Sequence, residues 1–341
     1  MIRVIEPGLL STIQDEGRHG YQQFGVITSG VMDPFALRIA NRLVGNDEKE
    51  AAIEVTLTGP TLEFVEDGLI AVCGADFSAQ IDGEVCPTWR PVFVKKGSTL
   101  HMKFSKKGCR AIIAVGGGIQ IPAVMNSKST YIRAHLGGFE GRALDKGDVL
   151  KANALTSKSA LILSSLHKKR GSFTTTKWSI SFVFLYEIYY RKSLRVLKGR
   201  QFDEFSPSSK TDFWRSEYKL SPQSDRMGFR LDGPSLSRTV KEDLLSEAVA
   251  FGTIQVPSDG LPIILLADRQ TIGGYPKIGQ VASIDLPALA QRKPGEIIQF
   301  EEISHQDAQN LLVKREKDIK EIQWIIDQKL HQKGKTEYAK N

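Results

Sequence analysis

Short apolar runs separated by glycine turns most constrain what this 341-residue chain can fold into. Between residues 68 and 118, such runs alternate with turn signals at Asp82-Gly83, Gly97 and Gly108. An Asp-Gly pair between two apolar runs is typical of a β-hairpin. The same alternation of short apolar runs and turn signals occurs between residues 249 and 300. The pattern predicts a mainly β protein whose antiparallel sheets close as barrels or sandwiches, one in each half.

Few helices interrupt this pattern. Asp33 followed by Pro34 fits a helix N-cap and first helical position, and Gly45 fits the end of that helix. Ser304, with Asp307 three residues later, predicts the start of a second, amphipathic helix that continues toward the C-terminus. Amphipathicity alone leaves two interpretations open for this tail: it docks on its own barrel, or it binds a partner.

Charge and cysteine content exclude several classes of protein. The formal net charge is +7, and residues 151–200 hold 11 basic residues against one acid, Glu187. A basic excess confined to one stretch favours a solvated linker over a nucleic-acid-binding face. Three cysteines without a CxxC pair indicate a reducing compartment and no zinc cluster. With no secretion signal and no apolar run long enough for a membrane, we expect a cytoplasmic protein.

These observations predict four segments. Residues 1–154 form an N-terminal β-barrel half, residues 155–192 a basic linker, residues 193–303 a C-terminal β-barrel half, and residues 304–341 a helical tail.

The first segment rich in polar chemistry runs from Ser224 to Arg230, SDRMGFR. Either Arg226 or Arg230 could hold a carboxylate through paired N–H donors. Asp225 could accept a hydrogen bond from an amide N–H. The structural alternative is a loop in which these charges pair with one another.

The second such segment follows an apolar run that ends at Leu266 and reads ADRQTIGGYPK. Burying these polar side chains without partners would cost several kcal/mol each, so they line a pocket or a solvent-facing loop. Two glycines permit a close backbone approach to a ligand. The structural alternative is a plain hairpin end. The residues of interest are Asp268, Gln270, Thr271, Gly273, Gly274 and Tyr275.

The usual cofactor signatures are missing from the sequence. It contains no GxxxxGK[ST] loop, no GxSxG elbow and no HExxH pair. Residues 116–118, GGG, fit a tight turn better than a dinucleotide loop. Residues 28–33 precede the first helix, where an anion could bind, although the pattern favours Asp33 as a plain N-cap. Ser127, Ser129, Thr130 and Arg133 form a hydroxyl-rich loop without an evident role.

Four segments together resemble one family, that of allophanate hydrolase subunit 2 and the C subunit of 5-oxoprolinase. They read SGVMDPFALRIANRLVGN, GGGIQIPAVMNSKSTYIRA, SDRMGFRLDGP and GLPIILLADRQTIGGYPKIGQV. The same family supplies half of the carboxyltransferase domain (subdomains A and B) of biotin-dependent urea carboxylase. The resemblance runs from about residue 2 to 302 and implies a cyclophilin-like β-barrel architecture. Segment 155–192 and the tail after residue 304 lie outside the shared motifs.

The resemblance implies a component of an ATP-dependent 5-oxoprolinase that is inactive alone. This complex opens the lactam of 5-oxoproline to L-glutamate and hydrolyses ATP. The implied partners are an allophanate hydrolase subunit 1-like (KipI-like) protein and a LamB/YcsF-like subunit. Two alternatives remain: a regulatory protein of the KipA type that antagonises a kinase inhibitor, and a carboxyltransferase half acting with carboxybiotin. No biotin attachment motif and no metal site are expected on this chain, and its ATP site stays unknown.

Lactam chemistry then suggests roles for the two polar segments. We expect catalytic roles for Asp225, Arg226, Gln270 and Thr271: Arg226 holds the substrate carboxylate, Asp225 accepts from the ring N–H, and the other two donate to oxygen. We expect substrate-binding roles for Ser224, Arg230, Asp268, Gly273, Gly274 and Tyr275, with the tyrosine walling the ring.

Overall fold

The fold was analysed in a computed structural model that describes residues 1–167, 171–240 and 244–338. The chain divides into two compact units, each assembled from separate stretches of sequence. Unit 1 comprises residues 1–17, 33–182 and those from 316 onward, and unit 2 comprises residues 18–32 and 183–315. A short segment from the first half of the sequence therefore belongs to the second unit.

Unit 1 contains two six-stranded sheets. Their strands are β1 (Ile2–Glu6), β2 (Leu10–Gln14), β3 (Ala52–Thr56), β4 (Thr61–Phe64), β5 (Gly68–Asp76), β6 (Gln80–Ile81), β7 (Glu84–Val85), β8 (Val92–Val94), β9 (Thr99–His101), β10 (Lys107–Val115), β11 (Val149–Leu150) and β12 (Phe173–Thr175). The strand orders are β11-β1-β4-β9-β6-β7 and β12-β8-β5-β10-β3-β2. Asp82 and Gly83 both adopt positive φ between β6 and β7, which confirms the predicted hairpin.

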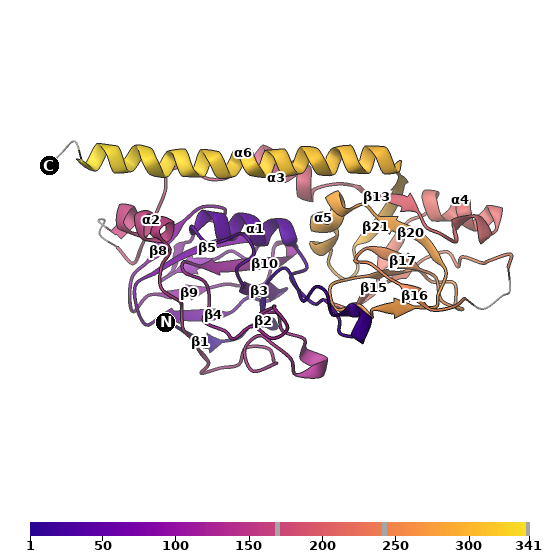
Figure 1. The fold of residues 1–341 in the computed structure, drawn as a ribbon, viewed down its shortest axis with the longest axis horizontal. Helices are drawn as coiled ribbons and strands as arrows, with labels where there is room; N and C mark the ends of the chain where they lie inside the picture. The colour runs from indigo at the N-terminus through magenta and orange to yellow at the C-terminus, as the bar shows by residue number, and fades with distance from the viewer. Residues whose placement is uncertain (168–170, 241–243, 339–341) are drawn as a thin grey trace. The chain divides into compact units, whose positions relative to one another are not determined.

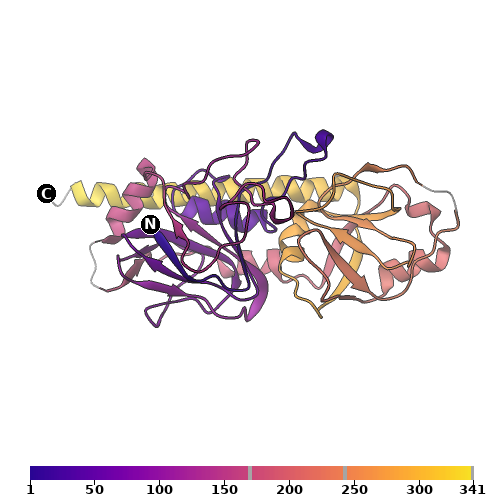
Figure 2. The same ribbon diagram turned by 90° about the horizontal axis from the view of Figure 1, so that it is seen from below.

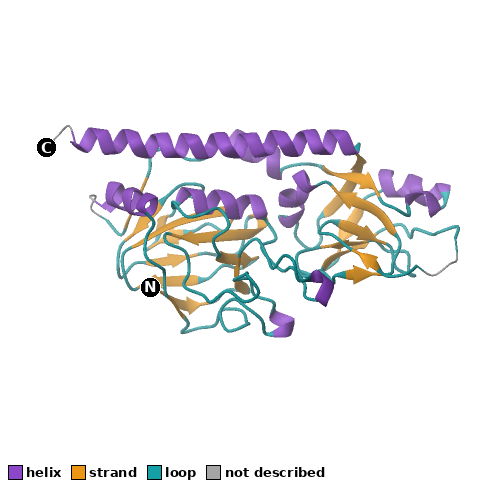
Figure 3. Ribbon diagram, in the orientation of Figure 1, coloured by secondary structure: helices purple, strands orange, loops and turns teal. Residues whose placement is uncertain are grey.

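The core of unit 1 lies between these sheets. Buried side chains from both of them, such as Leu62 and Phe64 from β4 and Val72 from β5, form one cluster. Helix α1 (Pro34–Leu43) packs against β5 and β10 (Figures 1 and 3). Every residue of β10 from Cys109 to Val115 is buried, because side chains on successive positions point alternately toward the core and toward the helix.

The predicted signals for helix α1 are confirmed. The carboxylate of Asp33 accepts a hydrogen bond from the backbone N–H of Ala36 at 2.9 Å, and Pro34 occupies the first helical position. Gly45 follows the helix with a φ of 77°.

The segment expected to be a basic linker carries regular structure. It contains helix α2 (Ser157–His167), strand β12 and helix α3 (Phe182–Tyr189). Strand β12 pairs with β8 and so extends a sheet of unit 1. The Thr156 hydroxyl donates to the carbonyl of Gly45, and the Ser159 hydroxyl donates to the carbonyl of Val44. These hydrogen bonds hold the start of α2 against the end of α1.

Unit 2 is built around a closed barrel of seven strands (Figure 2). Its order is β13 (Ser193–Lys198), β20 (Lys277–Val281), β17 (Thr253–Gln255), β18 (Ile263–Leu265), β15 (Gly228–Asp232), β14 (Tyr218–Leu220) and β21 (Ile297–Glu302). Strands β16 (Glu247–Ala248) and β19 (Ile272–Gly273) form a separate pair, and helices α4 (Pro207–Arg215) and α5 (Leu286–Ala290) complete the unit. Short 3-10 turns lie at Gln22–Phe24, Ile132–Ala134, Phe202–Glu204 and Ser283–Asp285.

The expectation of a mainly β protein with two barrel halves needs correction. Among the described residues the fold is mixed α and β, the second half closes into a barrel, and the first half forms two six-stranded sheets. Apolar runs and turns specify antiparallel pairing, but closure depends on strand tilt and stagger, which a local pattern does not contain.

The long helix α6 (His305–Tyr338) begins as predicted. Ser304 accepts from the N–H of Asp307 at 3.0 Å and donates its hydroxyl to the Asp307 carboxylate at 2.6 Å. Farther along, Ile319 and Ile326 are buried at 2% and 4% exposure. Of the two open interpretations, burial of this face supports docking on the protein's own surface.

Ion pairs reinforce this docking within unit 1. The guanidinium of Arg38 on α1 donates to both carboxylate oxygens of Glu316 at 2.6 and 2.8 Å, and these hydrogen bonds raise the pKa of Arg38. Lys158 on α2 pairs with Asp327 at 2.8 Å.

Within the described residues, no helix is both long and apolar enough to span a membrane. The same part of the chain contains no cluster of three His, Cys, Asp or Glu side chains suited to a metal ion. Cys73, Cys86 and Cys109 are all buried.

Replacing Ile319 by alanine should lower the free energy of unfolding by about 2–4 kcal/mol, since it removes a fully buried side chain from the helix interface. Trp324→Ala, at a side chain that is 63% exposed, should change it by less than about 1 kcal/mol. Urea denaturation followed by circular dichroism measures both. If both variants lost the same free energy of unfolding, docking of the helix through its Ile319 face would be contradicted.

Candidate functional site

Strand register places two predicted polar segments at one end of the barrel. Gly228 of β15 lies opposite Leu265 of β18, so the residues before β15 meet the residues after β18. The N–H of Leu266 donates to the carbonyl of Met227 at 2.9 Å, and the N–H of Asp268 donates to the carbonyl of Arg226 at 2.9 Å. We call this end, formed by residues 224–227 and 266–269, the arginine edge.

A buried ion pair forms the centre of the arginine edge. The Arg226 guanidinium donates to the two carboxylate oxygens of Asp268 at 2.9 and 3.1 Å, and it also donates to the carbonyl of Gly30. Arg226 is 6% exposed and Asp268 8% exposed. Removing one partner of such a pair leaves a buried charge uncompensated, at a cost of about 3–5 kcal/mol. Arg226 thus has internal partners in place of the substrate carboxylate expected from the sequence.

The segment held by Arg226 is strained. Ser29 adopts a φ of 53°, which costs an L-residue on the order of 1 kcal/mol. Its side chain is 4% exposed, and the hydroxyl has no hydrogen-bond partner among the described residues. The backbone carbonyl of the preceding residue, Thr28, accepts a hydrogen bond from the N–H of Arg18 at 2.6 Å. A strained loop with an unsatisfied buried hydroxyl is typical of a site completed by a ligand.

Arg269 adds positive charge to this edge. Its guanidinium donates to the carbonyls of Val249 and Leu266 at 3.4 and 3.2 Å, and neither acceptor is charged. Burial lowers the pKa of Arg269, and the nearby Asp268 charge partly counteracts this effect. The guanidinium of Arg269 therefore differs from that of Arg226, whose hydrogen bonds include the buried Asp268 carboxylate.

The other predicted residues of the first segment serve the turn before β15. Asp225 is exposed, and its Oδ1 accepts from the N–H groups of Met227 and Gly228 at 2.8 and 3.3 Å. Ser224 accepts from the N–H of Arg230 at 3.0 Å. The Arg230 side chain is exposed, because it follows buried Phe229 on the alternating pattern of β15.

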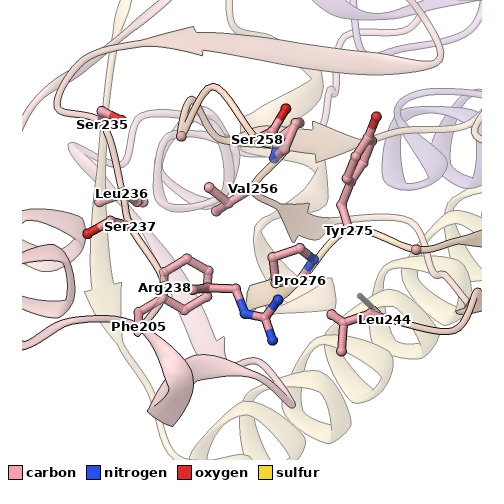
Figure 4. Close-up of a pocket in the computed structure, with 13 residues that line it drawn as sticks. Phe205, Ser235, Leu236, Ser237, Arg238, Leu244, Val256, Ser258, Tyr275 and Pro276 are labelled. Atoms are coloured by element: carbon pink, nitrogen blue, oxygen red, sulfur yellow. The ribbon is translucent and has the colours of Figure 1, made fainter. Parts of the chain in front are cut away.

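Tyr275 and Gly274 lie at the opposite end of the barrel, beside a cavity of about 520 Å³ (Figure 4). Val256 follows β17 and donates its N–H to the carbonyl of Pro276, just before β20, at 3.0 Å. Leu236 follows β15 and donates its N–H to the carbonyl of Gly260 at 2.9 Å. We call this end the cavity edge.

Residues 269–276 run between the two ends. The backbone carbonyl of Thr271 accepts a hydrogen bond from the N–H of Val249 at 3.3 Å. Gly273 is packed closely, because an added Cβ would lie 2.8 Å from the side-chain amide nitrogen of Gln255 and 3.3 Å from that of Gln270. From Leu266 to Pro262, strand β18 covers four residue steps, or roughly 13 Å. This separation exceeds the reach of a small lactam, so the structure does not bring all ten predicted residues around one small ligand.

The hydroxyl-rich loop of the sequence belongs to unit 1. Ser127 and Ser129 donate their hydroxyls to the buried carboxylate of Asp15 at 2.7 and 2.5 Å, and Thr130 donates to the carbonyl of Ile13 at 2.9 Å. These bonds tie the loop to the end of β2, so its hydroxyls are already satisfied.

Two residues at or beside the arginine edge had no role of their own in the sequence analysis. Arg269 stands beside Asp268 in the second polar segment, and the neutral carbonyls that accept its hydrogen bonds could not be read from the chain. Ser29 belongs to residues 28–33, which the sequence marked only as a possible anion site before the first helix. Positive φ at Ser29 and the contact of Gly30 with Arg226 arise from tertiary packing.

Comparisons with known proteins agree with this fold. The chain is 37% identical to the C subunit of 5-oxoprolinase from Escherichia coli (strain K12), over 96% of this chain and 99% of that protein. It is 39% identical to the corresponding 5-oxoprolinase protein of Haemophilus influenzae, over 96% of this chain and 100% of that protein. Its fold matches the crystal structure of the K. lactis urea amidolyase with a TM-score of 0.80 and 28% identity. That match covers 93% of this chain but 20% of the amidolyase.

The family model described as "Carboxyltransferase domain, subdomain A and B" matches residues 24–302, which contain the whole arginine edge, the segment from Thr28 to Gly30 and the cavity edge. The chain therefore belongs to the family of the carboxyltransferase domain, subdomains A and B.

Proposed function

We propose that this chain is the C subunit of an ATP-dependent 5-oxoprolinase, which opens 5-oxoproline to L-glutamate. The observation that carries the proposal is the level of sequence identity over nearly the whole chain. Two proteins that are C subunits of 5-oxoprolinase by name are 37% and 39% identical over 96% of this chain, whereas the K. lactis urea amidolyase is 28% identical over 93% of it. The higher identity supports the oxoprolinase function over the carboxylase function.

The chemistry of the substrate defines what such a subunit must supply. An unstrained lactam resists hydrolysis, and ATP hydrolysis supplies the driving force for opening it. The protein must hold the substrate carboxylate, orient the ring amide and stabilise negative charge that develops on the amide oxygen.

Within this chain, we assign the carboxylate to Arg269. Its guanidinium is half-buried at the arginine edge, and its own hydrogen bonds go to neutral carbonyls. A carboxylate ligand would offer this guanidinium charge-assisted hydrogen bonds, which are stronger than those to neutral carbonyls. Asp225, exposed on the adjacent turn, remains our proposal for accepting the ring N–H.

We assign the donor for the amide oxygen to the Ser29 hydroxyl. Arg226 and Asp268 act as positioning residues, because their pair and the Gly30 contact hold the strained segment in place. A fixed donor in a site of low dielectric stabilises developing charge more strongly than a mobile one in water. Gln270, Thr271 and Tyr275 lie beyond this edge, and the proposal gives them no contact with the lactam.

The proposal includes two companion proteins, an allophanate hydrolase subunit 1-like protein and a LamB/YcsF-like subunit. Both full-length relatives bear the name of one subunit of an enzyme, which supports work within a complex. The cavity at the other edge supports no triphosphate site, since Arg238, the charged residue of its lining, is paired with Glu204.

Reconstitution tests the proposed function directly. The chain mixed with both companion proteins should hydrolyse ATP in the presence of 5-oxoproline and release L-glutamate, and the chain alone should not. Phosphate release and glutamate are measured in parallel, with each pair of proteins as controls. A mixture that assembles but shows no 5-oxoproline-dependent hydrolysis would contradict the proposal, and carboxybiotin-dependent carboxylation of urea would replace it with the carboxyltransferase function.

Arg269→Gln should raise the KM for 5-oxoproline at least about tenfold in the reconstituted complex, because it removes a charge-assisted contact worth roughly 1.5–3 kcal/mol. Arg230→Gln is the matched control, and it should leave this KM within about twofold since its side chain is exposed on β15. Steady-state kinetics at saturating ATP measure both. If Arg230→Gln raised the KM for 5-oxoproline and Arg269→Gln did not, the substrate carboxylate would be assigned to Arg230 instead.

Ser29→Ala separates a structural role from a role in the reaction. Removing an unsatisfied buried hydroxyl should leave the free energy of unfolding unchanged or raise it by up to about 1 kcal/mol. The same variant should lower kcat of the complex about 10²-fold, because a donor to the developing oxyanion is lost. Thermal unfolding of the free chain and kcat of the complex are compared. Unchanged kcat would remove Ser29 from the assignment.

A further inference from the structure

Opening a lactam requires a proton at its nitrogen, and the contacts assigned above do not supply one. When water adds to the carbonyl carbon and the carbon–nitrogen bond breaks, the electron pair goes to the nitrogen, which must be protonated to leave as an amine. Arg226 and Arg269 cannot donate this proton, because a guanidinium keeps its protons in proteins. Asp225 is assigned as an acceptor, and Ser29 is assigned to the oxygen. The assigned contacts therefore leave the nitrogen without a general acid.

A histidine lies on the loop that leads to Ser29. Residues 18–32 belong to unit 2, and His19 is exposed near the start of this segment. The turn at Gln22–Phe24 stands at the tip of the same loop (Figure 2). Histidine exchanges protons near neutral pH and is the most frequent general acid in enzymes. His19 therefore has the chemistry that the reaction requires at the nitrogen.

Hydrogen bonds on both sides of His19 hold it to Thr28. The N–H of Arg18, the residue before His19, donates to the carbonyl of Thr28 at 2.6 Å. On the other side, Gly20 donates its N–H to the side-chain oxygen of Gln22 at 2.9 Å, and the side-chain amide of Gln22 donates to the Thr28 hydroxyl at 3.1 Å. The backbone of His19 is thus clamped to Thr28 from both directions.

This clamp places His19 close to the proposed oxygen donor. From His19 to Ser29, the path through Arg18 and Thr28 comprises two chain steps, each of about 3.8 Å between Cα atoms, and one hydrogen bond. The nitrogen and the oxygen of a lactam are bonded to the same carbon, so the groups that act on them must lie close together. Three other histidines of the chain belong to unit 1, namely His101, His135 and His167.

We propose that His19 is the general acid that protonates the lactam nitrogen. This inference rests on the proposed function, because it adds a residue to the same site. The imidazolium of His19 gives its proton to the nitrogen as the carbon–nitrogen bond breaks, and the attacking water returns a proton to the imidazole. The second proton of that water passes from the new carboxyl group to the amine, which leaves L-glutamate and a reprotonated His19.

Two substitutions of His19 separate proton transfer from hydrogen bonding. His19→Ala removes the imidazole, and His19→Gln keeps an N–H donor that does not transfer its proton. His305→Ala is the matched control, since His305 is an exposed histidine of unit 2 at the start of α6. Each variant is mixed with both companion proteins, and glutamate release is measured with and without added imidazole. Thermal unfolding verifies the fold of each variant.

Both variants of His19 should lower kcat for glutamate release at least about 10²-fold, with the KM for 5-oxoproline changed less than about threefold, because a general acid acts in the reaction step. Free imidazole at about 50 mM should raise the rate of His19→Ala at least about fivefold, because it replaces the missing acid. It should leave the wild type and His305→Ala unchanged. A residue with a merely structural role would show no such rescue.

Three outcomes would overturn the role of His19 while the wild-type complex still opens 5-oxoproline. Full activity of His19→Gln would show that a hydrogen bond suffices. A loss in His19→Ala that imidazole does not restore would assign the residue a structural role. Failure of His19→Ala to assemble with the companions, measured by sedimentation velocity, would make it a contact residue. A wild-type complex that assembles without opening 5-oxoproline would instead overturn the proposed function and, with it, this inference.

Discussion

The ion pair between Arg226 and Asp268 is the interaction on which the candidate site depends. It joins the turn before β15, the segment after β18 and the loop at Gly30, three stretches that lie far apart in sequence. Buried pairs of this kind add little net stability, because desolvation offsets their attraction, but they penalise every arrangement that leaves one charge alone. The pair thereby helps to fix the position of Ser29, whereas the hydrogen bonds of Arg269 go to neutral carbonyls.

A closed barrel has two ends, and in unit 2 these ends differ in chemistry. At the arginine edge, the buried pair of Arg226 and Asp268 lies beside the strained segment at Ser29. At the cavity edge, Arg238 pairs with Glu204, Lys277 pairs with Glu247, and Tyr275 is half-exposed. Strands of three to five residues separate the two ends.

The family model that matches residues 24–302 also covers proteins with a different reaction, so membership fixes the architecture and leaves the chemistry to the site. A carboxylate on the substrate is one physical difference between 5-oxoproline and urea. Under the proposed function, Arg269 is the residue that would distinguish the two substrates, because its hydrogen bonds go to neutral carbonyls.

Sequence alone determined the local features of this protein: the helix start at Asp33, the hairpin at Asp82-Gly83, the Ser304 cap and the two polar segments that flank β15 and β18. Each depends on neighbouring residues, so a local pattern contains the information. Only the tertiary structure decided that the first half forms two sheets, that residues 18–32 join the second unit, and that Arg226 pairs with Asp268 while Tyr275 lies at the opposite edge. These outcomes depend on strand stagger, on burial and on contacts across some 200 residues, where many pairings suit the same sequence and the packing of the whole core selects one.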